Sequence, residues 1–173
     1  RLVKDTAEKI AQPYVVNRWI GGMFTNWSEI KKRIYRLESL INEKESGELD
    51  RKYTKKERVL INREIDKLQF NFGGIKTVTK VADIMVVVDP RHDHIAITEA
   101  AEMNVPTIAI MSSDCDASKV TYPITVNDAL QSSVAIVLAE LGTAYQNGKA
   151  LYVPKPAAPR PDTRPARRPR TDA

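Results

Sequence analysis

The sequence predicts an α/β fold in which a Rossmann-like (flavodoxin-like) parallel sheet carries an inserted antiparallel coiled-coil helical hairpin. Two observations support this prediction. Residues 84–145 follow the order strand, helix, strand, short strand, helix, which is typical of a parallel sheet with crossover connections. Residues 26–72 instead contain two long helical segments with narrow apolar seams. With 173 residues, the chain is long enough for one such domain with a modest core.

The sheet is expected to begin at residue 84. Ile84–Val88 is rich in β-branched residues and ends at an aspartate, which indicates a strand buried on both faces. Residues 93–104 are predicted to be helical, and Pro106–Met111 forms a second apolar strand. Val120–Val126 is expected to contain a short edge strand. Asn127–Tyr145 is the last predicted helix, with its apolar side buried through Leu130, Val134, Val137, Leu138 and Leu141.

The hairpin is predicted from two capped helices of similar length. Asn26 with Glu29, and Thr54 with Glu57, have the spacing of a capping box at the start of each helix. The apolar residues repeat at spacings of three and four: Trp27, Ile30, Ile34, Leu37 and Ile41, then Ile61, Ile65, Leu68 and Phe72. A short polar linker joins the helices, which end at glycines: Gly47, and Gly73–Gly74. The alternative is a pair of amphipathic helices packed on the main core.

The chain is expected to divide into three regions. These are the α/β domain (residues 1–25 and 72–150), the hairpin (26–72) and a disordered basic tail rich in Pro and Arg (151–173). The chain opens with a helix over residues 1–11 that Pro13 closes, and Tyr14–Val16 is a strand candidate. An α/β domain seldom begins within a helix, so we expect that the N-terminal part of the domain is missing from this sequence.

Basic charge is unevenly distributed along the chain. Lys and Arg number 27 against 22 Asp and Glu, which gives a net charge of +5. Residues 25–72 contain twelve basic and nine acidic residues, and residues 151–173 contain six and two. Residues 73–150 are acidic, with five basic and nine acidic residues. This asymmetry indicates a polyanionic partner that contacts the hairpin and the tail, or a distribution that serves solubility alone.

Several classes of protein are disfavoured by composition and motifs. No apolar run approaches the roughly 20 residues of a membrane span. The single cysteine, Cys115, excludes an intramolecular disulfide and a Cys-based structural zinc site. No GxGxxG follows a strand, and GxxxxGKS/T does not occur. We therefore expect no cofactor and no small-molecule substrate.

The residues predicted to contact a polyanionic partner are mostly basic. Arg18 and Trp19 precede Gly21–Gly22 and can form a loop that stacks and contacts phosphate; alternatively, Trp19 anchors the hairpin base and Arg18 pairs with an acid. The other candidates lie on the hairpin and in the tail: Lys31, Lys32, Arg33, Arg36, Lys55, Lys56, Arg58, Arg63, Arg164, Arg167, Arg168 and Arg170. The nine acidic residues of the hairpin leave a simple solvated surface as an alternative.

Acidic residues cluster near the predicted strand ends, where ligands of α/β proteins bind. They are Asp83, Asp89, Asp93, Asp114, Asp116 and Asp128, with His92 and His94 close to the first strand. A small Rossmann-like enzyme that binds a metal or a nucleotide would use these groups. The alternative is structural, because Asp93 and Asn127 stand where helix N-caps belong.

Four blocks of sequence occur in a characteristic order: NRWIGGMFTN (residues 17–26), FGGIKTV (72–78), VADIMVVVDPRHDHIAITEAAEMNVPTIAI (81–110) and DCDASKVTYPITVND (114–128). Together they resemble the bacterial-type family of small-subunit ribosomal protein two. The resemblance spans about residues 1–145. It departs from the family in two loops, where residues 112–117 replace DTNCDP and residues 125–128 replace PGND, and the family's N-terminal GTKxxA motif is missing.

The resemblance implies a structural, non-enzymatic constituent of the small ribosomal subunit, without catalytic residues or a metal site. The implied partners are small-subunit ribosomal RNA, bound through shape and phosphate, and neighbouring ribosomal proteins, including ribosomal protein one, which holds messenger RNA. The implied location is a cytoplasmic or organellar ribosome, with no membrane partner. The small enzyme remains the main alternative, and a coiled-coil adaptor that binds proteins through its hairpin is the other.

Overall fold

The computed structural model describes residues 1–152 and has an α/β fold. In chain order its elements are α1 (Leu2–Lys9), α2 (Trp27–Glu45), α3 (Glu48–Lys52), α4 (Lys55–Phe72), the 3-10 turn η1 (Gly73–Ile75), β1 (Met85–Val88), α5 (His94–Glu102), β2 (Thr107–Met111), β3 (Tyr122–Thr125) and α6 (Gln131–Leu151). The predicted α/β class is confirmed, and the sheet is consistent with a Rossmann-like arrangement. Nearly all of the predicted tail lies outside the described residues.

The three strands form one parallel sheet in the order β1-β2-β3. Met85 of β1 pairs with Thr107 of β2, and Ile108 of β2 pairs with Tyr122 of β3. Helix α5 makes the crossover between β1 and β2 that parallel neighbours require. Strand β3 lies at an edge of the described sheet, as its sequence predicted.

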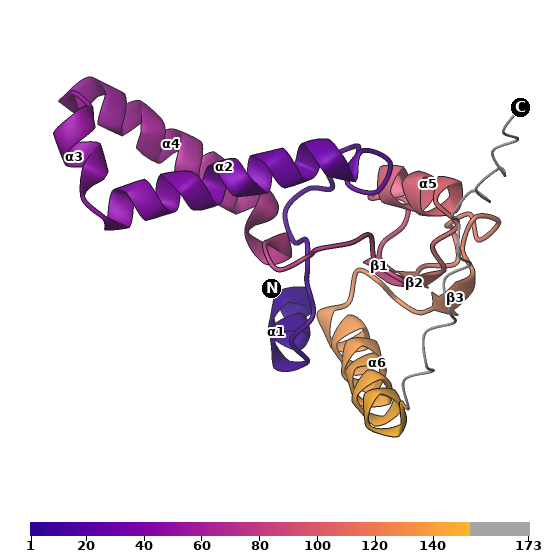
Figure 1. Cartoon of the computed structure of the whole chain (residues 1–173). Coiled ribbons are helices and arrows are strands. Elements are labelled where there is room, and N and C mark those ends of the chain that lie inside the picture. Colours follow the sequence, from indigo (N-terminus) through magenta and orange to yellow (C-terminus); the bar gives the residue numbers. More distant parts are fainter. Residues whose placement is uncertain (153–173) are drawn as a thin grey trace, which may run out of the picture.

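Helices lie on both faces of the sheet (Figure 1). Helix α5 packs on one face, in a cluster of Met85, Val87, Ala96, Ile97, Ala100 and Val105. Helices α6 and α1 pack on the other face, where Ile110, Val134 and Leu138 are buried and Leu2, Val3, Val88 and Leu141 are partly buried. Because neighbouring strand residues point to opposite faces, Val87 and Val88 belong to different layers.

Strand β1 is less buried than its sequence predicted. Its burial alternates, and Val86 is 45% exposed, as is Ile84 just before the strand at 47%. The prediction of a strand buried on both faces was therefore wrong. The physical reason is that β1 is itself an edge of the described sheet, and that the α1–α6 cluster reaches Val88 without including Val86.

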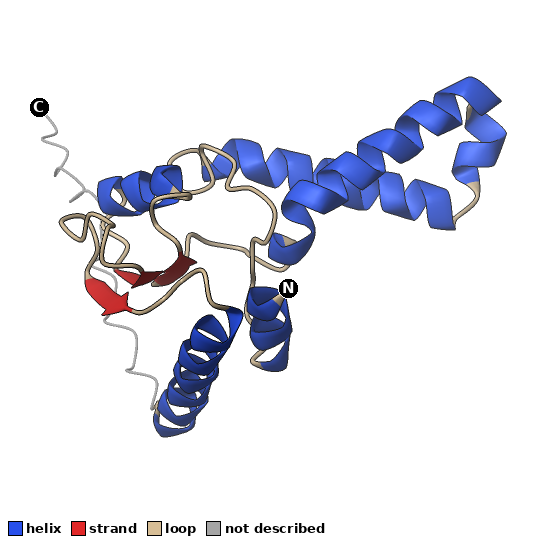
Figure 2. Cartoon of the chain, turned by 180° about the vertical axis from the view of Figure 1, so that it is seen from behind, coloured by secondary structure: helices blue, strands red, loops and turns tan. Residues whose placement is uncertain are grey.

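Helices α2 and α4 pack side by side and project away from the sheet, with α3 at the far end (Figures 1 and 2). Their shared core is Met23, Ile30, Ile34, Leu37, Leu40, Ile65, Leu68, Phe72 and Ile75. The predicted seam of α2 ended at Ile41, but Leu40 is the residue that is buried there and Ile41 is only partly buried. The prediction of a short polar linker between the two helices is wrong, because the connecting segment forms the short helix α3, which buries Leu49. Coiled-coil geometry and the domain boundaries stay predictions.

The two predicted capping boxes have different outcomes. At α4, the Thr54 hydroxyl accepts from the Glu57 N–H, and the Glu57 carboxylate accepts from the Thr54 N–H at 2.8 Å, so this box is confirmed. At α2, the Asn26 side chain makes no cap bond. Its Oδ1 accepts from the Ser28 hydroxyl at 3.2 Å, and Glu29 pairs with Lys32 instead. Helix α4 ends before Gly73 as predicted, although Gly73 is right-handed and begins η1, so it is not a left-handed glycine cap.

Thr54→Ala is expected to lower the free energy of unfolding by about 1 kcal/mol, because an N-terminal N–H of α4 loses its acceptor. Hydrogen bonds from Thr54 lower the pKa of Glu57, so their contribution is present above the normal glutamate pKa and is lost as the pH falls through the lowered value. Urea unfolding at neutral and acidic pH tests this. Thr77→Ala, at an exposed threonine, is the control; equal losses in both variants would exclude a capping effect.

The segment before the helical pair is not a strand. Residues 14–16 have no regular structure, although α1 ends before Pro13 as predicted. The Tyr14 N–H donates to the Gly74 carbonyl at 3.0 Å, and Asn17 Nδ2 donates to the Phe70 carbonyl at 2.6 Å. These bonds run to the end of α4 instead of to a sheet, which explains why an apolar sequence forms no strand here.

The limits and caps of the last two helices also differ from expectation. Helix α6 starts at Gln131, and Leu130, predicted to be buried, is 50% exposed. Asn127 caps no helix, since its Oδ1 accepts from the nearby Ala129 N–H. Asp93 stands at the N-cap of α5 but makes no side-chain cap bond. Among residues 1–152, no helix is both long and apolar enough to cross a membrane.

Candidate nucleic-acid interface

The loop that leads into α2 is fastened to the sheet domain by a buried carboxylate. Glu99 of α5 is 6% exposed. Its Oε1 accepts from the Gly22 N–H at 2.5 Å, and its Oε2 accepts from the Phe24 N–H at 2.9 Å. Gly22 has φ 94°, a conformation that favours glycine. Glu99 thus fixes where α2 leaves the sheet domain. Sequence reasoning missed this residue, because its partners lie more than seventy residues away.

Trp19 joins the core of the helical pair to the core beneath α5. It packs against both clusters, and its ring meets Phe24 edge to face, with centroids 5.0 Å apart. This burial favours the interpretation that Trp19 anchors the hairpin base over the one that it stacks on a base. Arg18 beside it is exposed, and no ion pair found among residues 1–152 includes it. The acid partner that we expected for Arg18 is therefore not found there.

The first turns of α2 carry three of the predicted cations. Arg33 is exposed and Lys31 is half-buried, and neither belongs to an ion pair found in the described part of the chain. Lys32 is exposed and pairs with Glu29, one turn earlier, at 2.5 Å. An exposed pair of this kind contributes little to stability. Lys31 and Arg33 are thus the two cations in the first turns of α2 that no acid holds, and both can contact phosphate.

Two predicted cations instead hold the helices together. Arg36 of α2 donates two hydrogen bonds to the Glu64 carboxylate of α4, at 3.2 and 3.4 Å, and these bonds raise the pKa of Arg36. Arg58 of α4 pairs with Asp50 of α3. The two-pronged contact of Arg36 with Glu64 orients that arginine strongly. Neither partner could be assigned from sequence, because 28 residues separate Arg36 from Glu64 and the α3 turn was not predicted.

The remaining cations lie on the outer side of α4. Lys55, Lys56 and Arg63 are exposed, and no ion pair found within residues 1–152 includes any of them. Lys67 has the same environment and was not among the predicted site residues. Its signal in the sequence was the spacing of four from Arg63, which places both on one side of the helix.

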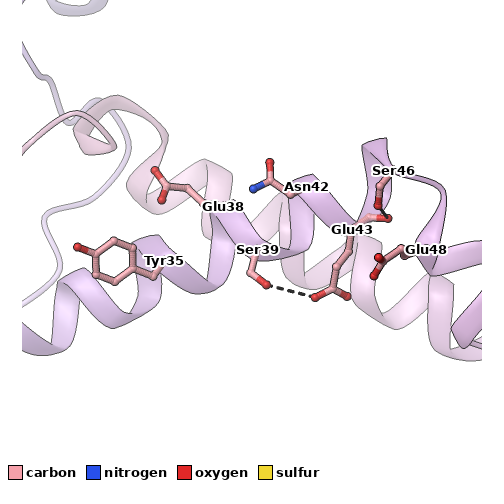
Figure 3. Close-up of a pocket in the computed structure, with 7 residues that line it drawn as sticks. All are labelled: Tyr35, Glu38, Ser39, Asn42, Glu43, Ser46 and Glu48. Atoms are coloured by element: carbon pink, nitrogen blue, oxygen red, sulfur yellow. Dashed lines mark hydrogen bonds between the residues drawn. The ribbon is translucent and has the colours of Figure 1, made fainter.

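A depression on the distal half of the helical pair is acidic (Figure 3). It has a volume of about 500 Å³ and is lined by Tyr35, Glu38, Ser39, Asn42, Glu43, Ser46 and Glu48. Ser39 donates to Glu43 at 3.2 Å. Of its three carboxylates only Glu48 is paired with a cation, Lys52, so Glu38 and Glu43 make the depression unfavourable to phosphate. The candidate phosphate contacts therefore lie near the sheet domain and on α4, and this part of α2 is unsuited to them.

The acidic residues at the strand ends are mostly engaged with the backbone. Asp89, Cys115 and Asp128 lie within 4.8 Å of one another, a set that could hold a metal ion. However, Asp89 accepts from the His92 N–H and Asp128 accepts from the Ser112 N–H, both at 3.1 Å. These bonds tie loops to the sheet edge, and they agree with the structural interpretation of the acids.

Two further acids near this edge have shifted pKa values with local causes. A hydrogen bond from Ser112, and secondarily the Arg91 guanidinium, lower the pKa of Asp114; its carboxylate lies 2.8 Å from Arg91. Partial burial raises the pKa of Asp93. Both pKa shifts have local causes in the packing of the loops, and neither indicates a catalytic acid or base. The predicted tail residues Arg164, Arg167, Arg168 and Arg170 lie outside the described residues.

Comparison with known proteins defines the class as ribosomal. The family model described as "Ribosomal protein S2" matches residues 1–148. The small ribosomal subunit protein uS2 of Sulfurimonas denitrificans is 39% identical over 149 residues, and that of Picosynechococcus is 38% identical over 148; each alignment covers 86% of this chain and 57% of the relative. The Micrococcus luteus protein of the same name is 37% identical over 146 residues, or 84% of this chain and 51% of the relative.

The chain therefore belongs to the ribosomal protein S2 family, as the sequence blocks predicted. It spans a little over half the length of the relatives from Sulfurimonas and Picosynechococcus. The matched region includes the sheet, the helical pair and the loop that Glu99 holds.

Proposed function

We propose that this chain is a structural constituent of the small ribosomal subunit that binds ribosomal RNA and supports translation. The observation that carries the proposal is the family match over residues 1–148, in which the relatives are named as small-subunit ribosomal proteins. A role without catalysis agrees with the acids at the sheet edge, whose charges are held by backbone N–H groups and by Arg91. The small-enzyme alternative is not favoured.

The proposed RNA surface combines the hairpin base with α4. Arg18, Lys31 and Arg33 lie where the loop meets α2, and Lys55, Lys56 and Arg63 continue along α4. None of these six is held by an ion pair among the residues that the structure describes. Cations of this kind neutralise phosphates and position a protein without reading sequence. Lys32 contributes more weakly, because Glu29 competes for its charge.

Three other predicted residues, together with Glu99, act on this surface indirectly. Trp19 and Glu99 set the direction of the helical pair, and Arg36 and Arg58 hold α2, α3 and α4 in register. We assign these arginines a positioning role, since a carboxylate already satisfies each of them. Arg164, Arg167, Arg168 and Arg170 of the tail remain proposed RNA contacts on the basis of charge alone.

The proposal extends to partners and location. We propose that the chain contacts neighbouring small-subunit proteins and helps to anchor ribosomal protein one, and that it acts on a cytoplasmic or an organellar ribosome. The support is the family resemblance together with the packing of helices on both faces of the sheet. This packing gives a rigid domain from which the helical pair projects. No membrane or small-molecule partner is part of the proposal.

Lys31→Glu with Arg33→Glu is expected to lower the occupancy of the chain in small subunits and its affinity for depleted subunits, because two phosphate contacts become repulsive. The slope of log affinity against log salt should fall by about 0.7–0.9 for each lost contact. Sucrose-gradient sedimentation and filter binding measure both quantities. Arg33→Glu alone, at an exposed position, tests the same surface without disturbing the half-buried Lys31.

Lys44→Glu with Arg51→Glu is the matched control, since it makes the same charge change at exposed positions near the distal end of the helical pair. Equal loss of occupancy in both double variants would mean that net charge, and not the hairpin base, governs incorporation. Absence of the unaltered chain from small subunits would overturn the proposed function itself.

A further inference from the structure

The outer side of α4 carries a second seam of exposed side chains that is turned away from α2. Its members follow one another at spacings of 4, 3, 4 and 3: Lys56, Leu60, Arg63, Lys67 and Phe70. All five are exposed, and the apolar members are large, with Leu60 55% and Phe70 60% exposed. The inner seam of the same helix, which includes Ile65 and Leu68, packs on α2.

The acids of α4 leave this second seam positively charged. Glu57 is bound in the capping box and Glu64 is bound to Arg36 of α2. Asp66 lies about 60° around the helix from Arg63, 80° from Lys56 and 100° from Lys67, at 100° per residue. Within residues 1–152, no ion pair is formed by Lys56, Arg63 or Lys67. The seam thus offers three free cations interleaved with two exposed apolar side chains.

The seam ends beside a small crevice. Phe70 shares this crevice with Val16, which is 42% exposed, and with Gly73 and Gly74. The crevice has a volume of about 140 Å³. The exposed apolar side chains Leu60 and Phe70 are joined on this side of α4 by Val59, which is 47% exposed. Contacts with phosphate alone would not use these apolar side chains. Apolar side chains at spacings of three and four are instead what a helix laid along α4 would cover.

We propose that this second seam of α4 docks an acidic amphipathic helix of another protein, which packs apolar residues on Leu60 and Phe70 and places carboxylates beside Lys56, Arg63 and Lys67. Charge complementarity selects this occupant. A second copy of the seam would set cation against cation, and the arginine-rich tail of this chain has the same sign. RNA would pair with the cations but leave the apolar members exposed. On this inference Lys56 and Arg63 contact the protein partner in place of RNA phosphates, and RNA binding by Arg18, Lys31 and Arg33 at the hairpin base is independent of it.

The test places the photo-crosslinking amino acid p-benzoylphenylalanine at Leu60 or at Phe70 of the full chain in cells, with Tyr35 as the control site because it is 63% exposed on α2. We expect Leu60 and Phe70, but not Tyr35, to crosslink to one protein segment with carboxylates spaced three and four residues apart. Lys56→Glu with Arg63→Glu and Lys67→Glu should lower the yield by at least about tenfold, since like charges then face each other. Lysines in place of the captured carboxylates should restore it.

Each other outcome overturns the inference: crosslinks to RNA alone, to a second copy of the chain, to nothing, or to a protein whose capture does not depend on the three charges. Circular dichroism of the triple variant checks that α4 remains folded, and the charge-swap rescue excludes a loss caused by unfolding. The same cells are fractionated on a sucrose gradient. Absence from small subunits would refute the proposed function, whereas the crosslinks report on the seam in whichever fraction the chain is found.

Discussion

Glu99→Gln is expected to lower the free energy of unfolding by about 2–3 kcal/mol, and to loosen the loop that leads into α2. The carboxylate accepts from the N–H groups of Gly22 and Phe24 and is almost fully buried. A glutamine amide has one oxygen and one NH₂ group, so it can satisfy one N–H and must present a donor to the other. A buried donor left without an acceptor costs about 1–3 kcal/mol, and bonds to a neutral oxygen are weaker than bonds to a carboxylate.

Urea unfolding measures the loss of stability, and hydrogen exchange of the Gly22 and Phe24 amides locates it. Glu102→Gln, on the exposed side of α5, is the matched control and should change neither quantity. Protection of both amides equal to that of the unaltered chain would show that the loop holds its place without the carboxylate. If the loop is freed, the basic residues at the hairpin base lose their fixed position, so occupancy in small subunits should fall as well.

Capping shows what local sequence could and could not predict. The same four-residue pattern occurs at Asn26 and Thr54, yet only Thr54 forms the box. The difference lies in a competing donor, since the Ser28 hydroxyl satisfies Asn26 and Lys32 draws Glu29 away. The periodicity of apolar residues was more reliable. It predicted α2, α4, α5, β1 and β2 within a few residues, because burial of a continuous face determines those elements.

For the candidate site, the sequence predicted which side chains are basic but not which of them are free. The pairing of Arg36 with Glu64 and of Arg58 with Asp50 depends on how α2, α3 and α4 meet in space. Glu99 was overlooked for a related reason: it is a charged residue in an apolar helix, and its two partners lie in a distant loop. Long-range contacts of this kind leave no periodic signal, so they became visible only with the fold.

Gly74→Ala is expected to destabilise the chain by about 3 kcal/mol, the upper part of the range for added bulk in a filled site. A Cβ on Gly74 would overlap the carbonyl oxygen of Tyr14 and lie 2.6 Å from its ring. The first of these atoms belongs to the backbone, so it can move only if the whole segment moves. That segment is held to the same glycine, because the Tyr14 N–H donates to the Gly74 carbonyl. The substitution should therefore detach residues 14–17 from the end of α4.

Two neighbouring cases make the expectation specific to this contact. Gly148→Ala, in α6 with nothing within 4 Å, should be neutral or should stabilise the chain by up to about 1 kcal/mol through helix propensity. At Gly73 the nearest atom is Nε2 of Gln69, at the end of a flexible side chain, so Gly73→Ala should cost less than Gly74→Ala. Thermal unfolding of the three variants gives the order. Because Gly74 does not need a left-handed conformation, a large loss there would arise from crowding against Tyr14 and not from backbone strain. Equal stability of the three variants would mean instead that residues 14–17 shift at little cost, and that the crevice beside Phe70 is not fixed in shape.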